Sequence, residues 1–430
     1  MIARSGRKRF YGWISLAGGM AVYFAMCGNY VYSFGIFLPV FSEEFNWSRT
    51  ALSGTLTASE VAWGMIGPLI GISVSRFGAR RNIFIGNMVA ALGLLGMVFV
   101  DEIWHIYLFY GALAGIGISF GSFLSITTMV NDWFIRKRSL DMSLVLAAGG
   151  VGGLIFPPFI SWLITTLGWR VAWVFLAGIH VVLAVVIGGV LVRNKPEEMG
   201  QFPDGDTSLV AGGTTGNSIN TTRVYQTPVD WTVRAALGTR SLWLILACDL
   251  ALWFPMGTII IHQVAYLQDR GFTSLMAASA LGLMVGISII GRLLFGILGT
   301  RFEGRYLIAA CLALMFAGII ALMNAKTLPL VYVCSVLCGI GYGGRLVNIP
   351  VILGAYFGRT HYARILGWTS PVLTVFGAGS PLIAGFIFDA TGSYMLAFQV
   401  GAVLLGVGFI LALMARPPKP YNSIPANNQP

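Results

Sequence analysis

The chain has 430 residues, of which 57% are hydrophobic and only 10% are charged, and its formal net charge is +11. Soluble domains carry about 25% charged residues, so a soluble chain of this length would need far more polar surface than this one offers. The composition therefore excludes an ordinary soluble protein and indicates an integral membrane protein. The five cysteines lie in apolar runs without a CxxC spacing, which predicts neither a disulfide framework nor a metal site.

Twelve apolar runs are each near or above the roughly 20 residues that a helix needs to cross a bilayer. We predict spanning helices at 12–39, 50–75, 82–100, 104–130, 140–166, 170–192, 241–266, 275–299, 304–323, 329–355, 362–388 and 394–415. The runs are too long and continuous for the alternating strands of a membrane barrel. The first run is also too long for a signal-peptide core, so we expect it to be a retained helix.

The positive charges follow the predicted topology. The segments 1–11, 76–81, 131–139, 193–240, 300–305, 356–364 and 416–430 hold 21 of the 27 Lys and Arg residues, whereas the alternate loops hold four. Cytoplasmic loops carry such an excess, so we predict that both termini are cytoplasmic. We expect a multi-pass monomer in a cell membrane, the bacterial inner membrane, and no nucleic-acid partner, because the charges sit between apolar runs.

The sequence repeats itself once. The segment GISVSRFGARRNI (71–83) matches GILGTRFEGRYLI (296–308) at an offset of 225 residues, and WFIR (133–136) matches YFGR (356–359) at an offset of 223. Internal duplication is typical of transporters whose site lies between two related halves. We predict a six-helix half at 1–193, a flexible cytoplasmic linker at 194–240, a second six-helix half at 241–415, and a cytoplasmic tail at 416–430.

These motifs resemble the major facilitator superfamily and, within it, the monocarboxylate porter family with its bacterial oxalate/formate branch. The matching segments are GPLIGISVSRFGAR (67–80), NDWFIRKRSLDMSLVLAAGGVGG (131–153), RNKPEEMGQFPDG (193–205) and GRLLFG (291–296). The resemblance implies an all-α membrane protein with the twelve-helix major facilitator fold. It also implies transport of small carboxylates such as lactate or pyruvate with a proton, and a carboxylate-binding role for Arg292. Ser75 and Ser288 stand where the family usually has acidic residues.

Arg292 is also a candidate without the family. A cation in the middle of a spanning helix costs roughly 2.5–3.5 kcal/mol, so it normally faces water or a partner. Its planar fork fits a carboxylate with two hydrogen bonds. The alternative is a structural ion pair with Asp249, which lies at a similar depth and is also a candidate proton carrier.

Three other polar residues lie in predicted helices, and each has two interpretations. Arg345 either binds the anion or extends to the inner surface as part of a gate. His262 either binds substrate and carries a proton or anchors a helix end at the membrane interface. Glu60 is either a proton-coupling group or a partner in helix packing. His180 is interpreted as a packing residue.

Further candidates are polar side chains on predicted helices and charges at the inner surface. Asn29 and Tyr32 are three residues apart, which places them on one helix face; with Ser122 and Tyr342 they are candidates for substrate binding or for helix packing. The predicted inner gate consists of Arg76, Arg80 and Asp141.

We therefore expect a secondary transporter of small monocarboxylates that works by alternating access with a proton, needs no cofactor and is not an enzyme. Its partners are a small organic anion, protons and the lipid bilayer. An oxalate/formate type of exchanger and another organic-solute exporter of the same fold remain open. So does a membrane sensor that signals through residues 194–240.

Overall fold

The computed structural model describes residues 10–47, 49–205 and 224–419, and within these ranges the chain is helical and has no strand. The α-helices are α1 Gly12–Ala25, α2 Phe34–Phe45, α3 Arg49–Met65, α4 Gly67–Gly96, α5 Ile103–Ile106, α6 Gly115–Gly121, α7 Phe123–Trp133, α8 Arg138–Leu167, α9 Trp169–Val182, α10 Val233–Leu237, α11 Arg240–Asp269, α12 Ser274–Leu298, α13 Gly304–Met323, α14 Leu328–Phe357, α15 Tyr362–Thr391 and α16 Met395–Met414. Three π-helical segments, η1 Met26–Val31, η3 Tyr107–Ala114 and η4 Leu183–Leu191, continue spanning helices, and 3₁₀ turns form η2 Met97–Phe99, η5 Pro196–Met199 and η6 Pro203–Gly205. The all-helical prediction is confirmed.

Each predicted spanning range is helical, and ten helices of the described residues are long and apolar enough to cross a membrane. The predicted ranges 50–75 and 362–388 supply no separate candidate by these criteria. They correspond to α3 with the start of α4, and to α15, and these helices pack against one another.

Two predicted boundaries are wrong. The first helix continues through η1 and α2 to Phe45, beyond the predicted end at 39. The predicted loop 76–81 is reduced to a single break in α4 at Gly78, whose φ of 83° lies in the left-handed region that glycine tolerates. One helix therefore ends and the next begins at this residue, without an extended connection between them.

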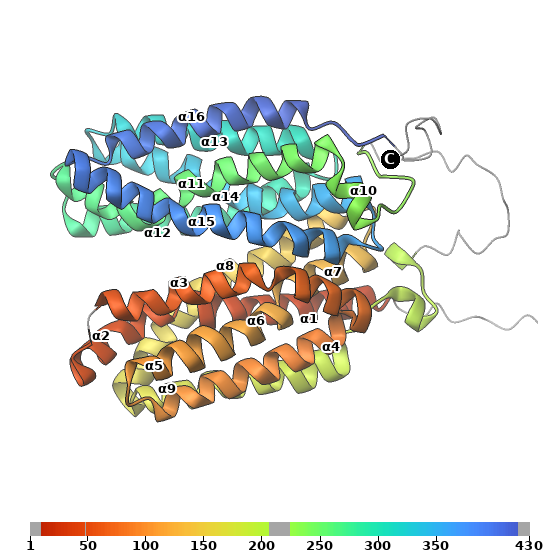
Figure 1. Cartoon of the computed structure of the whole chain (residues 1–430), viewed down its shortest axis with the longest axis horizontal. Coiled ribbons are helices and arrows are strands. Elements are labelled where there is room, and N and C mark those ends of the chain that lie inside the picture. The colour runs from red at the N-terminus through yellow and green to blue at the C-terminus, as the bar shows by residue number, and fades with distance from the viewer. Residues whose placement is uncertain (1–9, 48, 206–223, 420–430) are drawn as a thin grey trace, which may run out of the picture.

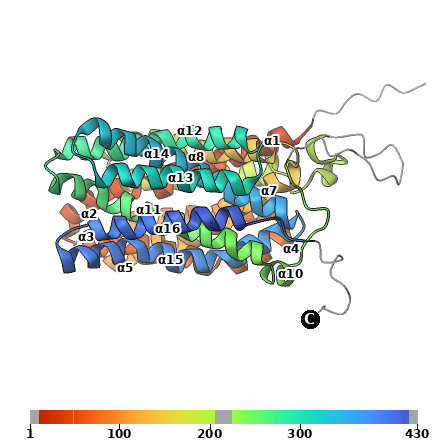
Figure 2. The same cartoon turned by 90° about the horizontal axis from the view of Figure 1, so that it is seen from above.

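The helices form two bundles that lie side by side (Figure 1). We call the bundle of α1 to α9 the N-bundle, the bundle of α11 to α16 the C-bundle, and the plane between them the seam. The start of α1, α7 and α10 lie at one end of both bundles, which we call the linker end; α2 and the start of α3 lie at the opposite, loop end (Figures 1 and 2). The exact limits of the two halves stay a prediction.

The described parts of the predicted linker are bound to the bundles. Asp204 accepts hydrogen bonds from the backbone N–H groups of Ile135 (3.2 Å) and Arg136 (2.9 Å) in the N-bundle. On the other side, the N–H of Thr227 donates to the carbonyl of Ala355 (2.8 Å) in the C-bundle. Residues 194–205 and 224–240 thus make contacts with the bundles, the flexible linker stays a prediction, and its polar stretch 206–223 lies outside the described residues.

Asp230 holds the turn that leads into α15. Its carboxylate accepts hydrogen bonds from the N–H of Arg359 (2.8 Å), the N–H of Thr360 (3.2 Å) and the Thr360 hydroxyl (2.6 Å). Partial burial alone would raise the pKa of Asp230, but these hydrogen bonds and the nearby Arg359 charge lower it overall. The carboxylate therefore favours the folded state.

This lowered pKa predicts a pH-dependent contribution to stability. A depressed folded-state pKa stabilises the fold fully above the ordinary Asp value of about 4, and the effect is lost as the pH falls through the lowered pKa. Asp230→Asn should lower the melting temperature by about 1–2 °C at pH 7, with the difference shrinking below pH 4. Melting curves of both proteins across pH test this, with Asp101→Asn as an exposed control. A difference that grows on acidification would contradict it.

Candidate functional site

Two of the contacts between the bundles along the seam are equivalent. Gly64 of α3 lies against Thr374 of α15, and Gly150 of α8 lies against Ile289 of α12. Each residue of one pair corresponds to a residue of the other at the offset of about 225 residues that relates the repeated segments. The internal duplication therefore places the same contact on both sides of the seam.

From these contacts toward the loop end, the bundles separate. Gly282 and Gly286 lie on the same face of α12 as Ile289, yet a side-chain carbon at either position would meet no atom within 4 Å. On α3, Glu60 is exposed one turn from Gly64, on the face that carries the contact with α15. Toward the linker end, by contrast, Gly296 of α12 lies against Ser143 of α8. The structure is therefore closed at the linker end.

Arg292 lies at this transition. Its side chain is 3% exposed, and its Nη1 donates a hydrogen bond across the seam to the carbonyl of Leu146 in α8 (2.5 Å). Its Nε has no hydrogen-bond partner. No carboxylate of the described residues forms an ion pair with it. A guanidinium has five N–H donors, so this one retains donors for a further acceptor.

Tyrosine side chains from both bundles lie near this guanidinium. Tyr23 and Tyr32 reach it from the N-bundle and Tyr342 reaches it from α14, all close enough to interact electrostatically with its charge. Tyr32 and Tyr342 are half-buried. Of the predicted substrate-binding residues, the structure thus brings together Arg292, Tyr32 and Tyr342, and it adds Tyr23, which was not predicted.

Asp249 and Arg345 form a second buried group inside the C-bundle. The Arg345 Nε lies 2.5 Å from the Asp249 Oδ1, and the two residues are 4% and 2% exposed. The guanidinium also lies over the ring of Trp253, 4.2 Å from its centroid. The alternative that Asp249 neutralises Arg292 is therefore wrong, and so is the extension of Arg345 to the inner surface. Trp253 packs against Gly377 of α15, which places this group beside the seam.

Besides Arg345, three predicted binding residues do not join the Arg292 group. Asn29 donates from Nδ2 to the carbonyl of Leu176 in α9 (3.3 Å), and the Ser122 hydroxyl donates to the carbonyl of Ile118 in the preceding helix α6 (2.6 Å). His262 packs its ring against Tyr394, with centroids 4.9 Å apart, roughly 20 Å along α11 from Asp249. The structure thus places Asn29 and Ser122 within the N-bundle and His262 at the loop end.

His180 packs in the N-bundle as the sequence indicates. Its Nδ1 hydrogen-bonds the Asn87 Oδ1 (2.8 Å), and the residue is 1% exposed. It therefore has a polar partner within its own bundle.

The predicted inner gate is assembled differently. Arg80 donates to the carbonyls of Gly188 and Gly189 at the end of η4, within the N-bundle, and Arg76 lies against the neighbouring Phe77 ring. Asp141 is fully buried, and its carboxylate oxygens have no hydrogen-bond partner in the described structure. These contacts leave Arg76 and Arg80 within one bundle.

Other residues connect the bundles at the linker end. Arg359 lies 3.8 Å from Asp132 and 2.9 Å from Glu197, measured between nitrogen and carboxylate oxygen. Arg364 donates to the Ser75 hydroxyl (2.7 Å). Ser75 stands where an acidic residue is usual, and it still contacts the C-bundle by accepting a hydrogen bond from this charged guanidinium. Arg359 and Arg364 were missed because they were counted as topological charges only.

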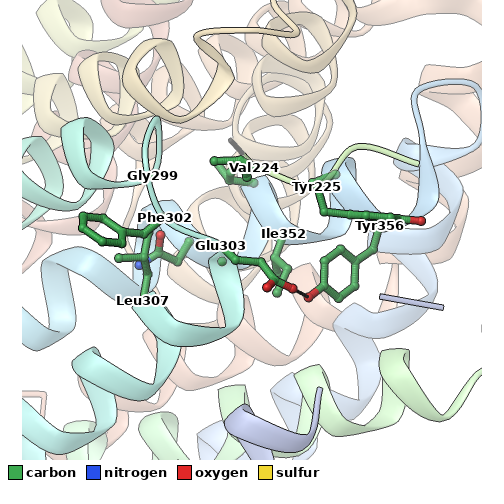
Figure 3. Close-up of a pocket in the computed structure, with 12 residues that line it drawn as sticks. Val224, Tyr225, Gly299, Phe302, Glu303, Leu307, Ile352 and Tyr356 are labelled. Atoms are coloured by element: carbon green, nitrogen blue, oxygen red, sulfur yellow. Dashed lines mark hydrogen bonds between the residues drawn. The ribbon is translucent and has the colours of Figure 1, made fainter. Parts of the chain in front are cut away.

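A small cavity beside these contacts is unsuited to an organic anion. It lies between Glu303, Tyr356 and residues 224–225, and the Tyr356 hydroxyl donates to the Glu303 Oε1 at 3.0 Å (Figure 3). Its volume is about 10 Å³, which holds at most a single water molecule.

Two related helical bundles that meet at a buried arginine, which has no ion-pair partner among the described residues, are an arrangement typical of membrane transporters. The comparisons agree. The family model of the Major Facilitator Superfamily matches residues 18–323 and 287–430, so the chain belongs to this superfamily and is a multi-pass membrane protein.

Named relatives and a solved structure give further detail. The chain is 27% identical over 411 residues to monocarboxylate transporter 13 of Bos taurus, covering 94% of this chain and 89% of the relative. It is 25% identical over 430 residues to monocarboxylate transporter 6 of Mus musculus, covering 94% and 87%. Its fold is similar to that of the transporter FucP in the outward conformation, with a TM-score of 0.70, 16% identity and coverage of 94% and 98%. The predicted resemblance to the superfamily and to monocarboxylate transporters is confirmed.

Proposed function

We propose that this chain transports small monocarboxylates by alternating access, with Arg292 as the partner of the substrate carboxylate. The observation that carries the proposal is a buried guanidinium with an unpartnered Nε and no carboxylate in ion-pair contact among the described residues. A buried cation without a counter-ion is costly, and an arriving carboxylate supplies both the charge and the acceptors. The names of the relatives support this substrate class.

The surrounding side chains suit a small organic acid. The hydroxyls of Tyr23, Tyr32 and Tyr342 offer donors and acceptors, while their rings offer apolar contact to a short carbon chain. The distribution of Lys and Arg predicts that the linker end lies in the cytoplasm. The structure is then closed on the cytoplasmic side, and the bundles are separated on the outer side. Substrate then enters from outside, and separation of the linker end releases it into the cytoplasm of the host cell.

The proposal is tested by uptake into proteoliposomes. Radiolabelled lactate, pyruvate, formate and oxalate are offered with and without an imposed pH gradient. We expect accumulation of at least one monocarboxylate when the acidic side is the side of substrate addition. Absence of transport for every small organic anion would refute the substrate class. Exchange of oxalate for formate without any effect of the gradient would favour an exchanger of the same fold.

Glu60 is the residue that we propose for proton coupling. It is exposed on the seam face of α3 where the bundles separate, so water and protons reach it in this conformation. A carboxyl group within the membrane passes through the conformational changes of the transport cycle most easily when it is protonated and therefore neutral. Asp249, by contrast, is held by Arg345.

Replacing Glu60 should separate coupling from binding. A gradient of one pH unit is worth about 1.4 kcal/mol, which supports up to about tenfold accumulation for one proton per substrate. Glu60→Gln should abolish this accumulation and keep substrate exchange across the membrane. Glu44→Gln, which alters an exposed carboxylate at the loop end, is the control. Full gradient-driven accumulation by Glu60→Gln would exclude Glu60 as the proton carrier.

A further inference from the structure

A large groove opens at the linker end, apart from the Arg292 group. Its volume is about 880 Å³. The N-bundle supplies one wall through α4 and the end of η4, and the C-bundle contributes Arg359, Thr360 and Ala363. Because both bundles line it, the groove has this shape only while the linker end is closed.

Positive charge dominates the lining. Five cations, Arg76, Arg80, Arg81, Lys195 and Arg359, face two acids, Asp132 and Glu198. Arg80 is held by backbone carbonyls and Arg359 by Asp132 and Glu197, so these two charges are already engaged.

The other three cations are available to a ligand. Arg76, Arg81 and Lys195 are exposed, and none forms an ion pair with a described carboxylate. Glu198 is occupied by hydrogen bonds from the N–H and the amide group of Asn194. The groove therefore offers three free positive charges to an anion.

The rim of the groove is apolar on the side that continues into the spanning helices. Phe77, Phe84 and Ile85 line it and are among the exposed large hydrophobic side chains of the N-bundle. This arrangement, with positive side chains next to exposed aromatic and aliphatic ones at the end of spanning helices, matches a phospholipid. The cations can contact its phosphate, and the apolar rim can contact its first acyl carbons. A soluble anion would use the charges but not the rim.

We propose that this groove binds the headgroup phosphate of an anionic phospholipid from the leaflet at the linker end. The lipid phosphate contacts Arg76, Arg81 and Lys195, and its chains lie against Phe84 and Ile85. Since Arg359 and Ala363 complete the groove from the other bundle, the bound lipid stabilises the state that is closed at the linker end. A ligand that binds one of two conformations better shifts the balance toward it.

The test uses the full chain in nanodiscs of phosphatidylcholine with or without phosphatidylglycerol. We expect phosphatidylglycerol to raise the melting temperature of the wild type by several degrees. The variant R76Q/R81Q/K195Q should lose most of this increase. The control K137Q/R234Q/R240Q removes the same charge from positions that do not line the groove, and it should keep the increase.

Three results would overturn the proposal. The groove variant could retain the full increase, or the control could lose as much as the groove variant, which would indicate general attraction to the surface. Inorganic phosphate could give the same increase in phosphatidylcholine alone, which would indicate a soluble anion. Counting the lipids that remain bound in native mass spectrometry gives a second readout, which is independent of stability: the wild type should retain phosphatidylglycerol, and the groove variant should not.

Discussion

Arg292→Gln is expected to reduce the initial rate of carboxylate uptake roughly 10- to 150-fold. A hydrogen bond to a charged group is worth about 1.5–3 kcal/mol, and each 1.4 kcal/mol corresponds to a factor of ten. Glutamine retains a polar end group near the Leu146 carbonyl, so the substitution removes the charge with little loss of packing. Uptake into proteoliposomes at subsaturating substrate measures the effect.

The matched control for this variant is Arg170→Gln. Arg170 forms an exposed pair with Glu44 at the loop end (3.2 Å), and exposed pairs contribute little. Its uptake should stay within about twofold of the wild type. Melting curves complete the comparison, because added substrate should stabilise the wild type and Arg170→Gln but not Arg292→Gln. Normal uptake by Arg292→Gln would remove the basis of the proposed carboxylate site.

Asp249→Asn is expected to destabilise the protein by about 3–5 kcal/mol. The substitution leaves the Arg345 charge buried without its carboxylate, and the contact with Trp253 compensates only a small part. The expected result is a clear fall in melting temperature and in the yield of folded protein. Thermal unfolding of the purified variant in detergent measures it.

The double variant Asp249→Leu/Arg345→Met distinguishes a lost ion pair from a damaged core. Replacing both partners of a buried pair by apolar residues is often neutral or stabilising, so the double variant should recover most of the lost stability. If it is stable and transports normally, the pair has only a structural role. If the single variant is as stable as the wild type, Arg345 has a second partner and the expected cost is wrong.

The spanning helices and Arg292 could be predicted because each depends on a strong local signal. Long apolar runs specify helices in lipid, and a lone cation within one of them requires a partner or a cavity. The partner of each charge could not be predicted in the same way. Asp249 lies at a depth that suits either arginine, and only the rotation of α11 against α14 pairs it with Arg345.

The positions of Asn29 and Tyr32 show a different limit. Residues three apart share a face in a regular α-helix, which is why both were assigned to one site. The π-helical segment η1 contains Asn29 and ends directly before Tyr32, and the wider turn of a π-helix changes this relation. Asn29 therefore faces α9 while Tyr32 reaches Arg292. Apolar periodicity gives no signal for such a segment.

The equivalent pairs Gly64–Thr374 and Gly150–Ile289 are two contacts about which the bundles could rotate against each other. Because the two pairs are equivalent in the two halves, rigid rocking of the bundles about them would close one end of the molecule as it opens the other. In the proposed alternating-access cycle, this geometry would prevent a continuous pore without a separate plug, and a solute bound beside these contacts would be exposed to one compartment at a time.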